Sequence, residues 1–170
     1  MDGIKAALVL FVVALLQLCV LTEYRPFRTA SIVIVALLSV ALLRGSIFGA
    51  VAGFMTGLLL DTATLGTLGI TSLLLTVFGF WIGRYGETTA RDRFHAPYLS
   101  VAVVTVLYAF GQVLLQFVLG ESAPVGLVAH GLPLAVLVNL ILTLPVYTLI
   151  RRLFPPLELG DRVREVRLLG

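Results

Sequence analysis

The side chains that could do chemistry in this sequence are few, and most of them lie inside long apolar stretches. Asp61 ends the stretch RGSIFGAVAGFMTGLLLD, residues 44–61. An acid in such surroundings is costly unless it is paired or functional. Two interpretations follow for Asp61: it accepts hydrogen bonds from the turn 62–69 or the next helix start, or it binds a ligand or a proton.

Three amide side chains interrupt the later apolar stretches. Gln112 and Gln116 lie one helical turn apart, with Tyr108 on the same stripe, and Asn139 lies deep in the last apolar stretch. In lipid, such amides form hydrogen bonds between helices, whereas in a transporter they would line a substrate pocket. We favour the first interpretation.

The sequence gives little indication of a metal site, a cofactor site or a catalytic site. Cys19 is the single cysteine, which excludes an internal disulfide, and His95 and His130 lack the close spacing of a zinc site. An aspartyl enzyme would need a second acid beside Asp61. We therefore predict a protein that is not an enzyme and has no catalytic residues, no metal site and no cofactor.

Glycine recurs at intervals of four residues in two places. Helices associate in lipid where small residues let their backbones approach, so these glycines predict at least one close helix contact. That contact is either a seam inside this protein or a docking face for a partner's helix. The glycines are Gly45, Gly49, Gly53 and Gly57, which precede Asp61, and Gly79 and Gly83, which precede Arg84.

The elements that must position these residues are membrane helices. The 170 residues are 59% hydrophobic and 12% charged, about half the charge of a typical soluble domain, and the mean hydropathy is +1.08. We predict one all-α integral membrane domain, residues 1–150, followed by a basic cytoplasmic tail, 151–170. The net charge of +3 concerns membrane sidedness, and no nucleic-acid partner is expected.

Six transmembrane helices are predicted. The stretch 30–60 would extend about 46 Å as a single helix and would leave Arg44 in the middle of the bilayer. A hairpin that turns at Arg44–Gly45 removes both problems, although its two spans are short. The predicted spans are 4–22, 27–43, 45–60, 65–83, 98–119 and 127–150.

The basic residues indicate how the helices are oriented. With six spans and both termini in the cytoplasm, only Arg25 and Arg28 lie on the outer side, in agreement with the rule that cytoplasmic loops are basic. A five-span arrangement with an outer N-terminus satisfies this rule almost equally well. The length of the stretch 30–60 and the cost of burying Arg44 favour six.

Residues 45–84 carry a resemblance to a known family. The sequence GSIFGAVAGFMTGLLLDTATLGTLGITSLLLTVFGFWIGR resembles the rod shape-determining protein MreD family, which has a Gly-rich third span that closes on Leu and Asp, a short Leu-Gly loop, and a fourth span that ends in Gly-Arg. The matching polar positions are Asp61 and Arg84.

The resemblance implies a multi-pass protein of the bacterial cytoplasmic (inner) membrane with a fold similar to the substrate-binding subunits of energy-coupling-factor transporters. It also implies a non-enzymatic scaffold of the cell-elongation machinery. The implied partners are an MreC-like single-span protein, membrane lipid and, indirectly, an MreB-like actin and a SEDS/class B penicillin-binding protein synthase that makes peptidoglycan. The alternative is a vitamin-type solute-binding subunit of a transporter, although the first span has no alanine pair four residues apart for docking an energising module.

Overall fold

The computed structural model describes residues 2–17, 31–64, 67–88, 96–120 and 125–153, and these residues form six α-helices and no strand. The described part of the chain is therefore all-α, as the sequence predicts. The helices are α1 (Asp2–Leu16), α2 (Ile32–Arg44), α3 (Ser46–Thr64), α4 (Ile70–Thr88), α5 (Ala96–Val118) and α6 (Val125–Leu153).

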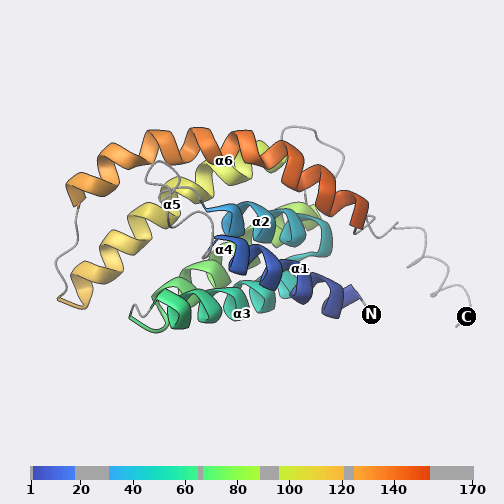
Figure 1. Ribbon diagram of the computed structural model, residues 1–170, viewed down its shortest axis with the longest axis horizontal. Coiled ribbons are helices and arrows are strands. Elements are labelled where there is room, and N and C mark those ends of the chain that lie inside the picture. Colours follow the sequence, from blue (N-terminus) through green and yellow to red (C-terminus); the bar gives the residue numbers. More distant parts are fainter. Residues whose placement is uncertain (1, 18–30, 65–66, 89–95, 121–124, 154–170) are drawn as a thin grey trace, which may run out of the picture.

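Successive helices run in alternating directions (Figure 1). As a result, the start of α1 and the end of α6 lie at the same end of the molecule. The longest helices, α5 and α6, form an arched pair above the other four, and α3 and α4 lie along the opposite side. The pair α3–α4 has the most extensive contact in the fold.

The short helix α2 is the core of the bundle. Every residue from Val33 to Leu43 is buried, and α2 contacts each of the other five helices. Ser31 sets the start of α2 as its N-cap. The backbone of Ser31 is extended, and its side-chain oxygen accepts a hydrogen bond from the amide of Ile34. A helix that is apolar on all sides is expected to be enclosed on all sides.

The helix boundaries differ from the predicted spans where caps and turns set them. Helix α2 begins at Ile32 rather than 27 because of the Ser31 cap, and α4 begins at Ile70 rather than 65, after a turn that ends at Gly69. The predicted break near residue 45 is present, with Gly45 between α2 and α3. Gly45 has φ +98° and ψ −179°, a conformation that is essentially restricted to glycine. Residues 18–22, 27–30 and 65–66 of the predicted spans, and the tail beyond 153, lie outside the described residues.

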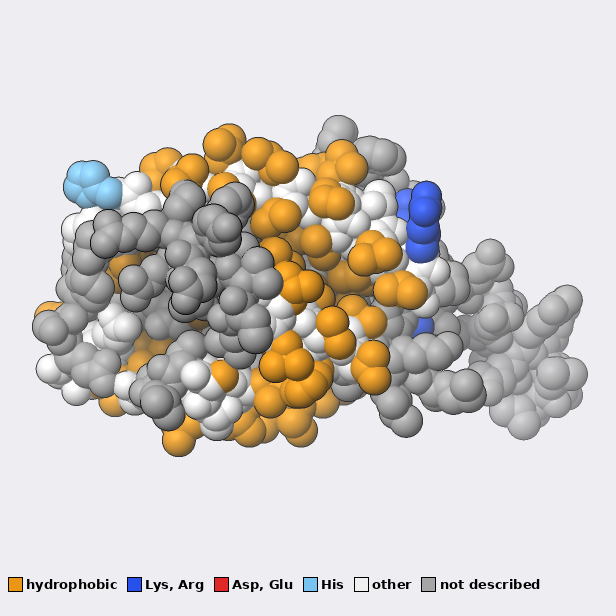
Figure 2. All heavy atoms as spheres, viewed as in Figure 1, with side chains coloured by type: hydrophobic (Ala, Val, Ile, Leu, Met, Phe, Trp, Pro, Cys, Tyr) orange, Lys and Arg blue, Asp and Glu red, His pale blue; other side chains and the backbone are white. Residues whose placement is uncertain are grey.

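Three of the described helices are long and apolar enough to cross a membrane: Ser46–Ala63, Pro97–Val118 and Val128–Leu153. Helix α2 is apolar but has only 13 residues, about 20 Å. Large apolar side chains cover much of the outer surface, as Figure 2 shows for one face. Together these features identify a membrane protein; that all six helices cross the bilayer stays a prediction.

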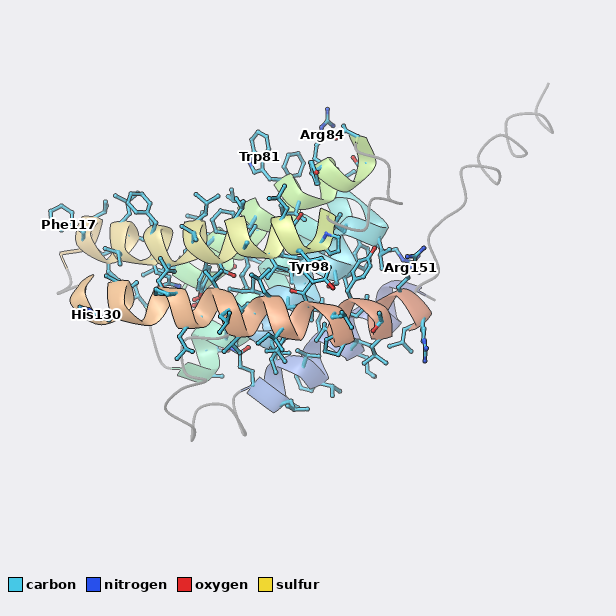
Figure 3. The ribbon with its side chains drawn as sticks, turned by 90° about the horizontal axis from the view of Figure 1, so that it is seen from above. Trp81, Arg84, Tyr98, Phe117, His130 and Arg151 are labelled. Atoms are coloured by element: carbon cyan, nitrogen blue, oxygen red, sulfur yellow. The ribbon has the colours of Figure 1, made fainter. Side chains whose placement is uncertain are left out.

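Charge is concentrated at one end of the bundle. Arg84 and Arg151 lie at the end where α6 finishes, whereas His130 and Phe117 lie at the opposite end (Figure 3). Arg44 is the last residue of α2 and lies at the same end as Arg84, because the main chain of the next residue, Gly45, lies against Gly83. We refer to this as the basic end.

A glycine seam, two carboxylate caps and a polar pocket

The spaced glycines lie along the contact between α3 and α4. We name the six glycines 45, 49, 53, 57, 79 and 83 the glycine seam. The two helices pass each other in opposite directions, so the residue number rises along one helix as it falls along the other. The facing pairs are Gly45–Gly83, Gly49–Gly79, Gly53–Leu75 and Gly57–Ser72.

The glycine seam brings backbone against backbone. A Cβ atom added to Gly53 would lie 2.6 Å from the carbonyl carbon of Leu75, and one added to Gly79 would lie 2.8 Å from the carbonyl carbon of Gly49. Main-chain atoms cannot rotate away as a side chain can, so any larger residue would push the helices apart. The seam is therefore occupied by two helices of the same chain, and its glycines are not available on the outer surface in this conformation.

Asp61 caps the start of α4 from the end of α3. Its side chain is 3% exposed, and its two oxygens accept hydrogen bonds from the amides of Gly69 (2.9 Å), Thr71 (3.3 Å) and Ser72 (3.2 Å). The first amides of a helix have no partner within the helix and carry partial positive charge, which a carboxylate neutralises. Gly69, at the N-cap position, has no side chain that could do this. Of the two interpretations for Asp61, this is the geometry of a cap.

Glu87 makes the matching cap at the other end of the hairpin. Its carboxylate accepts from the amide of Ser46 at 2.8 Å and from the Ser46 hydroxyl at 3.1 and 3.2 Å. The end of α4 thus caps the start of α3, as the end of α3 caps the start of α4. Sequence reasoning missed Glu87, although Gly79, Gly83 and Glu87 repeat the spacing of four that leads to Asp61.

The Glu87 cap gives a first testable prediction. In a Glu87→Ala protein the Ser46 amide loses its acceptor, and we expect unfolding to become easier by about 1 kcal/mol, the usual cost of losing an N-cap. A thermal unfolding curve in detergent measures this. Thr88→Ala is the control, because the Thr88 hydroxyl binds only carbonyls of its own helix and should leave the midpoint unchanged. An equal shift in both proteins would contradict a specific cap.

Two other polar residues singled out from the sequence, Arg84 and Gln116, belong neither to the caps nor to a buried hydrogen-bond network. Arg84 is exposed on α4 at the basic end (Figure 3). Gln116 is partly exposed on α5 and does not line the pocket described next.

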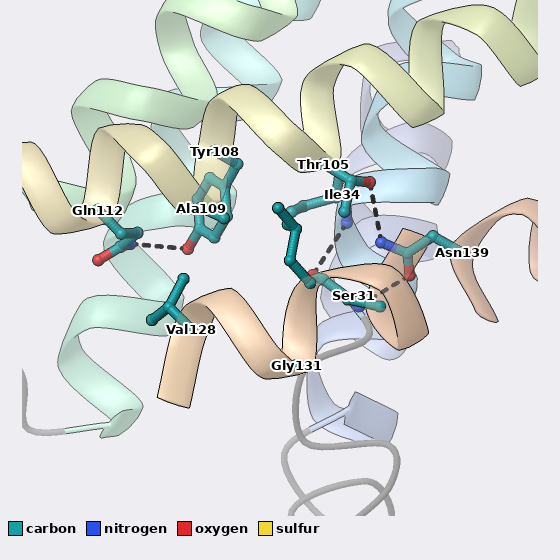
Figure 4. Close-up of a pocket in the computed structure, with 11 residues that line it drawn as sticks. Ser31, Ile34, Thr105, Tyr108, Ala109, Gln112, Val128, Gly131 and Asn139 are labelled. Atoms are coloured by element: carbon teal, nitrogen blue, oxygen red, sulfur yellow. Dashed lines mark hydrogen bonds between the residues drawn. The ribbon is translucent and has the colours of Figure 1, made fainter. Parts of the chain in front are cut away.

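A polar pocket of about 210 Å³ lies between α2, α5 and α6 (Figure 4). It includes two of the three predicted amides, Gln112 and Asn139, and is situated toward the end of the bundle opposite the basic end. Its lining residues are Ser31, Ile34, Thr105, Tyr108, Ala109, Gln112, Val128, Gly131, Leu132, Ala135 and Asn139.

Asn139 joins three helices at one end of the pocket. Its side chain is fully buried; the Nδ2 group donates to the Thr105 hydroxyl at 3.0 Å, and Oδ1 accepts from the amide of Ser31 at 3.0 Å. Gln17, the residue directly after α1, extends the network: its side-chain oxygen accepts hydrogen bonds from the Ser31 hydroxyl and the Val33 amide. These contacts hold the start of α2 between α5 and α6.

Gln112 connects the other end of the pocket to the Asp61 cap. Its Nε2 group donates to the Tyr108 hydroxyl at 2.9 Å and to the Thr71 hydroxyl at 3.4 Å. The amide of Thr71 in turn donates to Asp61. Among the described residues, every buried side-chain nitrogen and oxygen has a hydrogen-bond partner, as burial in an apolar setting requires.

The described residues contain no group of three histidine, cysteine or acidic side chains that could hold a metal ion. What they do contain is a tightly joined helical hairpin, capped at both ends, and a polar pocket under a buried helix. This is the architecture of a membrane domain built on close helix packing.

Comparison with known proteins supplies the family. Neither the curated proteins nor the solved structures include a match. The family model for the rod shape-determining protein MreD, however, matches residues 4–153. That match includes all six helices apart from the first two residues of α1. Because it spans most of the 170 residues, this chain belongs to the rod shape-determining protein MreD family.

Proposed function

We propose that this protein is a non-enzymatic scaffold in the bacterial cytoplasmic membrane that supports rod shape by binding an MreC-like single-span partner. Through that partner it would reach an MreB-like actin in the cytoplasm and a SEDS/class B penicillin-binding protein synthase that builds peptidoglycan. The observation that carries the proposal is the family match over residues 4–153.

The arrangement of the helices is compatible with this role. The proposal includes six membrane crossings with both termini in the cytoplasm, and it is supported by the alternating helix directions and by the basic end (Figures 1 and 3). Arginines near the ends of membrane helices favour the cytoplasmic side. The polar groups inside the bundle bind one another, as expected of residues that hold a scaffold together.

The partner would bind an outward face, because the glycine seam is occupied from within. Two such faces carry large exposed side chains. The outer side of α3 includes Ile47, Val51 and Met55, which recur every four residues, and the outer side of α6 includes Leu137, Ile141 and Leu144. Each of these side chains is more than 40% exposed in the isolated chain, so alanine substitution should not disturb the core.

Co-purification tests the proposal. The full chain would be solubilised with an MreC-like protein, and the two triple-alanine variants would be compared with wild type. We expect the amount of partner that co-purifies with one of the two variants to be at least about tenfold lower than with wild type, because a few large side chains dominate most interfaces. The melting temperature of that variant should equal that of wild type. The other variant is the matched control. Failure of the wild-type chain to retain the partner would overturn the proposed function.

The pocket favours a second candidate, a small-solute-binding subunit of a transporter. The two candidate functions predict different defects in cells depleted of the protein. Depletion of the protein should convert rods to spheres under the scaffold proposal, whereas under the transporter proposal solute uptake would fall and cell shape would be kept.

A further inference from the structure

The pocket between α2, α5 and α6 has room for a ligand. Its volume of about 210 Å³ equals roughly seven water molecules at the density of the liquid. Several lining residues, among them Ala109, Gln112, Val128 and Gly131, are partly exposed. Within the described residues the pocket is therefore open on the side of α5 and the start of α6.

The pocket is suited to an uncharged ligand. None of its lining residues is acidic, basic or a histidine. The nearest acid in the hydrogen-bond network, Asp61, already accepts three amide hydrogen bonds at the cap. An ionised group in this position would be far from water without a partner of opposite charge, which is strongly unfavourable.

Hydrogen-bonding capacity remains at both ends of the pocket. The Oε1 atom of Gln112 accepts no hydrogen bond from the described residues, because both contacts of this side chain are made by Nε2. Asn139 donates one of its two Nδ2 protons and accepts one hydrogen bond at Oδ1. Its side chain can therefore still donate one hydrogen bond and accept one more. In Figure 4 the two amides stand at opposite ends of the pocket. A ligand that both donates and accepts, such as a hydroxyl compound, would match them.

The rest of the lining is apolar. Ile34, Ala109, Val128, Leu132 and Ala135 form the walls between the two amides. The surrounding solvent of a membrane domain is lipid, and an acyl chain can leave the pocket on its open side. A ligand with a small hydroxyl-bearing head and an apolar chain satisfies both the amides and the walls.

We propose that the pocket between α2, α5 and α6 binds the hydroxyl-bearing head of an uncharged glycerol lipid. The proposal goes beyond the scaffold function and does not depend on it. The acyl chain would run outward past the partly exposed residues of α5 and α6, and the head would lie between Gln112 and Asn139.

Three probes separate the chemistry involved: monoolein has both head and chain, methyl oleate has the chain without hydroxyls, and glycerol has the hydroxyls without a chain. Binding to the purified full chain in detergent would be measured with radiolabelled monoolein and unlabelled competitors. We expect saturable binding of one monoolein per chain, competition by methyl oleate that is at least about tenfold weaker, and none by glycerol. Equal competition by methyl oleate, competition by glycerol, or no saturable binding would each overturn the proposal.

Matched variants locate the binding. Gln112→Leu removes a polar end of the pocket and should weaken monoolein binding about tenfold, whereas Gln116→Leu, one turn further along α5, should leave it unchanged. Ala109→Phe fills the pocket and should abolish binding, with Val103→Phe, at an exposed position of the same helix, as its control. Should the phenylalanine variant fail to fold, the glutamine pair still decides. Equal affinities for Gln112→Leu and Gln116→Leu would overturn the assignment to this pocket.

Discussion

Replacing Gly53 by leucine should prevent the membrane domain from folding, and the Gly53→Leu protein should elute from a sizing column as aggregate. A Cβ atom at this position would overlap the carbonyl oxygen of Leu75 and lie 3.0 Å from the amide nitrogen of Thr76. Both are main-chain atoms in the middle of α4, so α3 and α4 would have to separate along the whole glycine seam. We expect a loss of more than about 3 kcal/mol, at the upper end of overpacking effects.

Gly126→Leu is the matched control for Gly53→Leu. Gly126 lies in the first turn of α6, and an added Cβ there would meet no atom within 4 Å. Its elution and melting temperature should equal those of wild type. A folded, monodisperse Gly53→Leu protein that had lost an MreC-like partner would contradict our assignment, because the glycine seam would then serve as a docking face.

The second large effect is expected at Asp61. Asp61→Ala leaves the amides of Gly69, Thr71 and Ser72 without their acceptor, and the Ser72 amide is buried. The substitution removes hydrogen bonds to a charged group and also the carboxylate at the start of a helix. Together these losses should lower the free energy of unfolding by about 3 kcal/mol. The measurement is the melting temperature in detergent, followed by the fluorescence of Trp81, the only tryptophan.

Two further variants define the role of Asp61. Asp61→Asn keeps one acceptor oxygen and should fall between wild type and Asp61→Ala. Thr62→Ala, at the neighbouring exposed position, removes only hydrogen bonds to carbonyls of its own helix and should have no effect. If Asp61→Ala melted with wild-type stability but the protein no longer supported rod shape, Asp61 would act on a ligand or a proton instead of as a cap.

Local sequence patterns predicted the all-α class and drew attention to the glycine spacing, because both depend on residues close together in the chain. A glycine every fourth residue marks one side of a helix whatever lies opposite. The partner of that side, α4, and the register of Gly53 against Leu75 depend on the whole bundle. No local pattern specifies them.

Contacts between distant residues explain what sequence reasoning missed. Glu87 is 41 positions from Ser46, and Asn139 is 108 positions from Ser31, so no local pattern identifies either partner. The apolar stretch likewise gives no indication that Ser31 provides the cap from which α2 begins. The likeness to energy-coupling-factor transporter subunits stays a prediction, because no solved structure matches the chain.

The complete burial of α2 has a consequence for how the protein is made. A helix of 13 residues extends about 20 Å and is too short to cross the roughly 30 Å hydrocarbon core alone. The translocon would therefore have to release α2 together with a neighbour, and α3 is joined to it through the single residue Gly45. Until the later helices arrive, α2 would be exposed to lipid on sides that they finally cover. Biogenesis of this domain should thus be completed only when α6 leaves the ribosome, and truncation before α6 should yield a chain that is degraded.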